Sequence, residues 1–191
     1  MEAMLTSTLV VALAEIGDKT QLLAILLATR FKRPVPIILG ILAATLANHF
    51  LAALVGQQVA SLLSGVWFRY LIAASFILMA GWTLIPDKLD DDEGEQKSHG
   101  GAFLTTLIAF FLVEMGDKTQ LATVALGARF DAVVPVTIGT TLGMMIANVP
   151  AVLFGSALLR YVPLKVVRWI AAGLFFVIGL WLLVQTAGFL G

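Results

Sequence analysis

Six apolar stretches, each long enough to cross a lipid bilayer, constrain the fold of this chain more than any other feature of its sequence. About 20 apolar residues let a helix span the hydrocarbon core. Only helices and closed barrels satisfy their backbone hydrogen bonds in lipid, and the stretches lack the alternating pattern of barrel strands. The sequence therefore predicts an all-α polytopic membrane protein with six transmembrane helices, at residues 4–28, 35–58, 66–85, 102–127, 134–158 and 165–187.

The remaining composition excludes several kinds of partner. The chain has 12 basic and 12 acidic residues and a formal net charge of zero. Because no dense basic cluster is present, nucleic acid is excluded as a partner. The chain has no cysteine, which excludes disulfides and thiolate metal sites. The expected partner is the lipid bilayer, and assembly into a homo-oligomer stays open.

An offset of 99 residues aligns the second half of the sequence with the first. Residues 15–31 and 114–130 are identical at ten of seventeen positions. Each half holds an odd number of apolar stretches, so the second half enters the membrane from the opposite side, as in inverted-repeat transporters. We expect a three-helix repeat at 1–86, an acidic cytoplasmic loop at 87–101 and an inverted three-helix repeat at 102–191.

The lysines and arginines of the loops predict the orientation. Eight of them lie on the side of the first, third and fifth connections, and two lie on the opposite side. Because short loops rich in Lys and Arg stay in the cytoplasm, the central loop is predicted to be cytoplasmic and both termini to lie outside.

Four acidic residues lie within the apolar stretches, and all of them belong to the repeated segment: Glu15, Asp18, Glu114 and Asp117. An ionised side chain at the centre of a span costs about 2.5–3.5 kcal/mol. Together with two lysines of the same segments, the four acids would cost roughly 15–20 kcal/mol of insertion free energy before any pairing. Such a cost indicates a functional site, because intramembrane ionisable groups are usually functional.

On a continuous helix, Glu15, Asp18 and Lys19 share one face, which Gln21 extends at its edge. The second repeat builds the same face, and inverted symmetry would point the two faces at each other near the bilayer midplane. The predicted metal ligands are Glu15, Asp18, Gln21, Glu114, Asp117 and Gln120, with Lys19 and Lys118 balancing their charge.

Oxygen ligands select hard cations such as Ca²⁺, Mg²⁺ or Mn²⁺. Four carboxylates less two ammonium groups leave a formal charge of −2, which one divalent cation or two protons would neutralise. Exchange of the two is therefore the predicted cycle, with the four motif acids carrying the protons. A purely structural ion pair between Glu15 and Lys19 is the simpler alternative, but two facing copies favour function.

Other polar and small residues of the spans are secondary candidates. Asn48 and Asn148 are further possible ligands, although hydrogen bonds between helices are their favoured role. His49 aligns with Asn148, which excludes a symmetric histidine site and leaves a proton relay open. Gly17 and Gly116 are compatible with close helix packing or a local break, and we expect packing.

The two copies of E-x-G-D-K-T, at 15–20 and 114–119, resemble the signature E-x-G-D-[KR]-[ST] of the Gdt family of membrane cation/proton exchangers. We call these copies the first and second motif. The resemblance covers essentially the whole chain and implies that the motif acids bind the ion and couple it to protons. The compact six-span form is similar to the bacterial members, which include manganese exporters, and this implies Mn²⁺ export across the cell inner membrane.

The predicted function is a secondary transporter that exports a divalent cation, Mn²⁺ or else Ca²⁺, from the cytoplasm in exchange for protons, without enzyme activity or a cofactor. Two alternatives stay open: a divalent-cation channel with the same carboxylates as a selectivity ring, and an exporter of small cationic organic solutes. An intramembrane enzyme is disfavoured because the sequence has no nucleophile–base pair or zinc-type His/Cys set.

Overall fold

The computed structural model describes residues 1–63, 65–86, 100–155, 157 and 163–188, and these residues form eight helices without a strand. The prediction of an all-α protein is confirmed. The helices are α1 (Glu2–Glu15), α2 (Lys19–Phe31), α3 (Pro34–Leu62), α4 (Val66–Thr83), α6 (Ala102–Glu114), α7 (Lys118–Phe130), α8 (Val133–Phe154) and α10 (Leu164–Thr186). Most of the predicted acidic loop, 87–99, lies outside the described residues.

Four helices, α3, α4, α8 and α10, are long and apolar enough to cross a membrane. They match four of the predicted spans. The prediction of continuous helices at 4–28 and 102–127 is wrong, because each of these stretches contains two shorter helices, α1 with α2 and α6 with α7. Each interruption falls at a motif, where the charged residues lie.

The glycine of each motif interrupts the helix. Gly17 has φ +83° and Gly116 has φ +80°, a left-handed conformation that residues with a Cβ adopt only at a cost. Asp18 and Asp117 then take the N-cap positions of α2 and α7, which aspartate favours. The local break, which we did not favour, is therefore present at both glycines. Glu15 and Asp18 consequently do not share the face of one continuous helix. Close packing applies to Gly17 alone, where an added Cβ would lie 2.7 Å from Leu164 Cδ2, whereas one at Gly116 meets nothing within 4 Å among the described residues.

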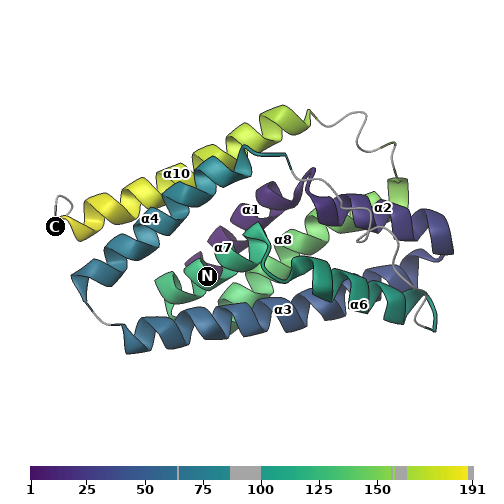
Figure 1. The fold of residues 1–191 in the computed structure, drawn as a ribbon, viewed down its shortest axis with the longest axis horizontal. Coiled ribbons are helices and arrows are strands. Elements are labelled where there is room, and N and C mark those ends of the chain that lie inside the picture. Colours follow the sequence, from purple (N-terminus) through teal and green to yellow (C-terminus); the bar gives the residue numbers. More distant parts are fainter. Residues whose placement is uncertain (64, 87–99, 156, 158–162, 189–191) are drawn as a thin grey trace.

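The two halves pack through matching pairs of positions. Helix α1 lies against α8, and its counterpart α6 lies against α3. Helix α1 also contacts α7, and α2 contacts α6. The two broken helices, α1–α2 and α6–α7, therefore run antiparallel (Figure 1). A Cβ added to Gly40 would lie 2.8 Å from Thr106 Cβ, and one added to the aligned Gly139 would lie 2.9 Å from Ser7 Cβ. Because Ser7 aligns with Thr106, the same pair of positions meets twice.

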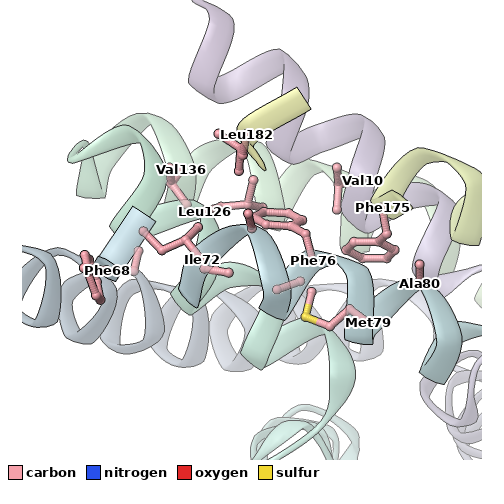
Figure 2. Close-up of a cluster of buried hydrophobic side chains, with 14 residues drawn as sticks. Val10, Phe68, Ile72, Phe76, Met79, Ala80, Leu126, Val136, Phe175 and Leu182 are labelled. Atoms are coloured by element: carbon pink, nitrogen blue, oxygen red, sulfur yellow. The ribbon is translucent and has the colours of Figure 1, made fainter. Parts of the chain in front are cut away.

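Helices α4 and α10 form an antiparallel pair, hereafter the arm, beside the other six helices (Figure 1). They approach closely at Gly179, where an added Cβ would lie 2.9 Å from Ala73 O. The rings of Phe76 and Phe175 lie 6.2 Å apart within the arm, and Figure 2 shows the buried cluster around them. The arm's main contacts with the six-helix core are those of α4 with α7 and of α10 with α1.

Candidate metal centre

Three carboxylates meet where the two broken helices are interrupted. Glu15 ends α1, Glu114 ends α6 and Asp117 precedes α7. One oxygen of each lies within 4.8 Å of the others. Both glutamates are fully buried and Asp117 is 6% exposed. Acids from both motifs thus come together, as the repeat predicts, although the helix ends position them rather than one continuous face.

The fourth predicted acid, Asp18, is buried at the start of α2 but does not belong to this group of three. Its counterpart Asp117 accepts a hydrogen bond from the backbone N–H of Thr119 at 3.5 Å. Both aspartates precede helix N-termini, where a negative charge is stabilised. The four acids are therefore not equivalent in this structure, despite their identical sequence contexts.

The two motif glutamates have different partners. The hydroxyl of Thr20 donates to Glu15 Oε2 at 2.5 Å, and the hydroxyl of Thr119 donates to Glu15 Oε1. Within the described part of the chain, neither Glu114 oxygen has a hydrogen-bond partner. Sequence analysis did not select the two threonines as site residues, although they occupy the last position of each motif.

The glutamines that follow each motif, Gln21 and Gln120, stabilise the helix breaks. Gln21 Oε1 accepts from the backbone N–H of Gly17 at 2.9 Å, and Gln120 Oε1 accepts from that of Gly116 at 2.6 Å. These N–H groups belong to the interrupted backbone, so the carboxamides replace a helical partner. Their Nε2 atoms donate to Ala147 O and to Asn48 Oδ1, both at 2.9 Å. Both ends of each carboxamide are thus engaged with protein.

The two asparagines near the carboxylates are hydrogen-bonded in different ways. Asn48 Nδ2 donates to Phe111 O at 3.0 Å, and its Oδ1 accepts from Gln120. Asn148 Nδ2 donates to Met144 O at 3.1 Å, and the side chain lies beside Glu15. Asn48 thus makes the hydrogen bonds between helices that we favoured for it, whereas Asn148 bonds within its own helix.

His49 is fully buried, and its Nε2 lies 3.8 Å from Glu114 Oε2. At this separation the two atoms are in contact but are not hydrogen-bonded. The imidazole therefore faces the glutamate that accepts no hydrogen bond among the described residues.

The motif lysines also differ. Lys19, at the start of α2, interacts electrostatically with Glu114 of the second motif. Lys118 Nζ donates to Ile85 O at 3.1 Å and lies 5.9 Å from the ring centroid of Trp82. Lys118 therefore links the second motif to the end of the arm, whereas Lys19 places a positive charge near the carboxylates.

Three buried carboxylates this close repel one another when ionised, and burial strengthens the repulsion because the interior screens charge poorly. A divalent cation or protons would relieve it. Their oxygens are suitable ligands for hard cations. The cluster therefore has the oxygen donors and the negative charge to hold a divalent cation.

Comparisons with known proteins point to the same chemistry. The model of the family described as "Divalent cation/proton antiporter GDT1" matches residues 3–91 and 102–188. A protein of Vibrio cholerae named "Putative manganese exporter" is 52% identical over 181 residues, which are 94% of this chain and 90% of that protein. GDT1-like protein 5 of Arabidopsis thaliana is 29% identical over 88% of this chain and 89% of its own length. No solved structure shows a significant match.

The helices and the family match together define the class: a helical membrane protein of a transporter family, with buried carboxylates at helix breaks. The family match extends over nearly all of the sequence. The chain belongs to the GDT1 family of divalent cation/proton antiporters.

Proposed function

We propose that this protein exports Mn²⁺ from the cytoplasm in exchange for external protons, with the carboxylates of Glu15, Glu114 and Asp117 holding the ion. The carrying observation is Glu114: it is fully buried, its two oxygens have no hydrogen-bond partner among the described residues, and two further carboxylates lie within 4.8 Å. A buried carboxylate without a donor is costly. A transported cation or a proton supplies what the protein does not.

The other predicted site residues take supporting roles in this proposal. Gln21 and Gln120 position the breaks, because both ends of each carboxamide are engaged with protein. Lys19 offsets the negative charge near Glu114. Asp18 carries protons with the three ligands, since it is buried and belongs to the same repeated motif.

We assign six membrane crossings to the chain, as two inverted repeats at 1–86 and 102–191 joined by a cytoplasmic loop at 87–101. The pairs α1–α2 and α6–α7 each act as one interrupted crossing, since about 27 helical residues extend roughly 40 Å and the hydrocarbon core is about 30 Å thick. The antiparallel contacts of these pairs support the inversion. The Lys and Arg bias supports termini outside the cell inner membrane.

The buried position of both glutamates suggests a conformation closed to either side. In a carrier built of inverted repeats, rocking of one part against another exposes a fixed central site alternately. Cytoplasmic Mn²⁺ binds the three carboxylates in one conformation. Protons replace it in the other conformation, which neutralises the cluster for the return step.

The test is Mn²⁺ uptake into proteoliposomes that hold the purified protein, an internal pH probe and an imposed proton gradient. We expect Mn²⁺ entry with proton exit, and acceleration when the interior is acidified. Parallel assays with Ca²⁺ rank the two ions, and Glu2→Gln serves as the matched control because Glu2 lies outside the motifs and is exposed.

Mn²⁺ entry that ignores the proton gradient would contradict antiport and indicate a channel. Absence of Mn²⁺ and Ca²⁺ flux, with proton movement driven by organic amines, would indicate an exporter of cationic solutes. Measurement in right-side-out and inverted cell vesicles then checks the proposed direction.

A further inference from the structure

His49 lies in the middle of α3 with no obvious structural role. Its side chain is fully buried, and in the described part of the protein neither ring nitrogen has a hydrogen-bond partner. A neutral imidazole carries one donor and one acceptor, and buried polar groups are normally satisfied. An imidazole buried in this way beside carboxylates is therefore arranged for a partner other than a protein hydrogen bond.

The distance to Glu114 fits two ligands of one ion. Ligands about 2.0–2.3 Å from a shared metal ion lie roughly 3–4.5 Å apart, depending on the angle between them. The 3.8 Å separation of His49 Nε2 and Glu114 Oε2 falls within this range. It is too long for a hydrogen bond, so the pair is better suited to a shared cation than to direct pairing.

The second repeat supplies an internal comparison for this position. Asn148 aligns with His49 and lies beside Glu15, as His49 lies beside Glu114. The Asn148 amide donates to Met144 O of its own helix. The two repeats therefore differ at this position: an amide lies beside Glu15, whereas an imidazole nitrogen lies beside Glu114.

Building on the function proposed above, we propose that His49 Nε2 is a ligand of the transported ion together with Glu114, the carboxylate that it faces at 3.8 Å. His49 lies outside the group of three carboxylates in this conformation, so the ion bound by His49 and Glu114 lies at the Glu114 side of that group. The resulting nitrogen–oxygen site takes first-row divalent transition ions such as Mn²⁺ in preference to Ca²⁺ and Mg²⁺. Imidazole is a common ligand of transition metals, whereas Ca²⁺ and Mg²⁺ prefer oxygen. An acid-only site, by contrast, discriminates weakly between Mn²⁺ and Ca²⁺.

The direct test is pulsed electron paramagnetic resonance of Mn²⁺ bound to the purified full-length protein in detergent. We expect a ¹⁴N coupling from the imidazole, replaced by a ¹⁵N coupling when the protein is grown with ¹⁵N-histidine. The coupling disappears in His49→Asn, which installs the residue found at 148. His99→Gln is the matched control for the second of the two histidines in the chain and keeps the coupling.

The functional arm measures competition of Ca²⁺ with Mn²⁺ transport in proteoliposomes. In His49→Asn we expect the preference for Mn²⁺ over Ca²⁺ to fall about tenfold, equivalent to about 1.4 kcal/mol, because Asn offers oxygen in place of nitrogen. His49→Gln replaces His49→Asn if the latter does not fold. The nitrogen coupling of the wild-type protein tests the assignment without any variant.

Bound Mn²⁺ without a nitrogen coupling in the wild-type protein, or an unchanged Mn²⁺ preference in folded His49→Asn, would overturn this assignment. If Mn²⁺ transport remained coupled to protons in that case, the proposed function would stand and only the role of His49 would fall. If the wild-type protein neither bound nor transported Mn²⁺, both proposals would fall.

Discussion

The first and second motifs have the same residues at their five shared signature positions and nearly the same backbone, yet their glutamates differ. The residues after Glu15 and Glu114 have φ of −66° in both copies, and the glycines that follow have φ of +83° and +80°. Glu15 nevertheless accepts hydrogen bonds from the hydroxyls of both motif threonines. Glu114 faces His49 and has no hydrogen-bond donor among the described residues. Equivalent local structure thus does not produce equivalent chemistry.

The difference arises in the helices that pack against the motifs. At one aligned position Asn48 offers a side-chain oxygen to Gln120, while Ala147 offers its backbone oxygen to Gln21. At the next position the residues are His49 and Asn148. Both repeats therefore contain the break, but its surroundings differ. Glu15 accepts hydrogen bonds from two threonines, whereas Glu114 accepts none among the described residues.

The largest expected effects come from replacing the two motif glutamates, which should alter transport and stability differently. Both Glu15→Gln and Glu114→Gln should lower proton-coupled Mn²⁺ flux at least about 100-fold, equivalent to about 2.7 kcal/mol, because each removes a carboxylate of the proposed ion site. Glu15→Gln should also destabilise the fold by about 1–2 kcal/mol, since one threonine loses its acceptor. Glu114→Gln should leave stability unchanged or raise it. Flux assays and thermal unfolding in detergent measure both quantities, and an equal loss of stability in the two variants would contradict the comparison.

The two glycines provide the next test. Gly17→Ala and Gly116→Ala each force a Cβ into a left-handed conformation, at about 1–2 kcal/mol. A Cβ at Gly17 would also lie 2.7 Å from Leu164 Cδ2, whereas one at Gly116 meets nothing within 4 Å. Gly17→Ala should therefore be the more destabilising in thermal unfolding.

Leu164→Ala supplies the control for that difference. It should recover part of the stability lost in Gly17→Ala and none of that lost in Gly116→Ala, as a double-mutant cycle would measure. Equal recovery in both backgrounds would show that the contact with Leu164 does not distinguish the two breaks.

Much of the fold could be predicted from the sequence because hydropathy is a local property. The four uninterrupted apolar helices follow from composition alone, and the offset of 99 residues identified the paired motifs. The breaks were missed because glycine is common in membrane helices for packing, and the sign of φ at Gly17 depends on the N-cap and carboxamide contacts that follow it. The hydrogen bonds of Gln21 and Gln120 to the glycine N–H groups were not predictable either, because those N–H groups become available only once the helix is interrupted.

The acids of the site were predictable because an intramembrane charge needs a reason to be there. Their asymmetry was not, since the two motifs are identical at the positions concerned. Only the packing of one broken helix against the other decides that Thr119 reaches Glu15 across the repeat. His49 was visible as a departure from the repeat, but its proximity to Glu114 required the structure.

The threonines provide the smallest and most discriminating test. Thr20→Val and Thr119→Val each remove one hydroxyl donor to Glu15 and should cost about 1 kcal/mol of stability, while Thr→Ser at either position keeps the donor and should cost less. Each valine variant should couple with Glu15→Gln in a double-mutant cycle of stability, and neither should couple with Glu114→Gln.

The same double-mutant cycle, measured on the transport rate instead of on stability, tests the second conformation of the transport cycle. If the inverted repeats exchange roles during the transport cycle, the threonine hydroxyls donate to Glu114 instead of Glu15 in the second conformation. The effects of Thr20→Val or Thr119→Val and of Glu114→Asp on the residual flux should then be non-additive. Their effects on the free energy of unfolding should remain additive. Additivity in both measurements would mean that Glu15 keeps both threonines throughout. The asymmetry of the motifs would then be a fixed property of the protein rather than of one conformation.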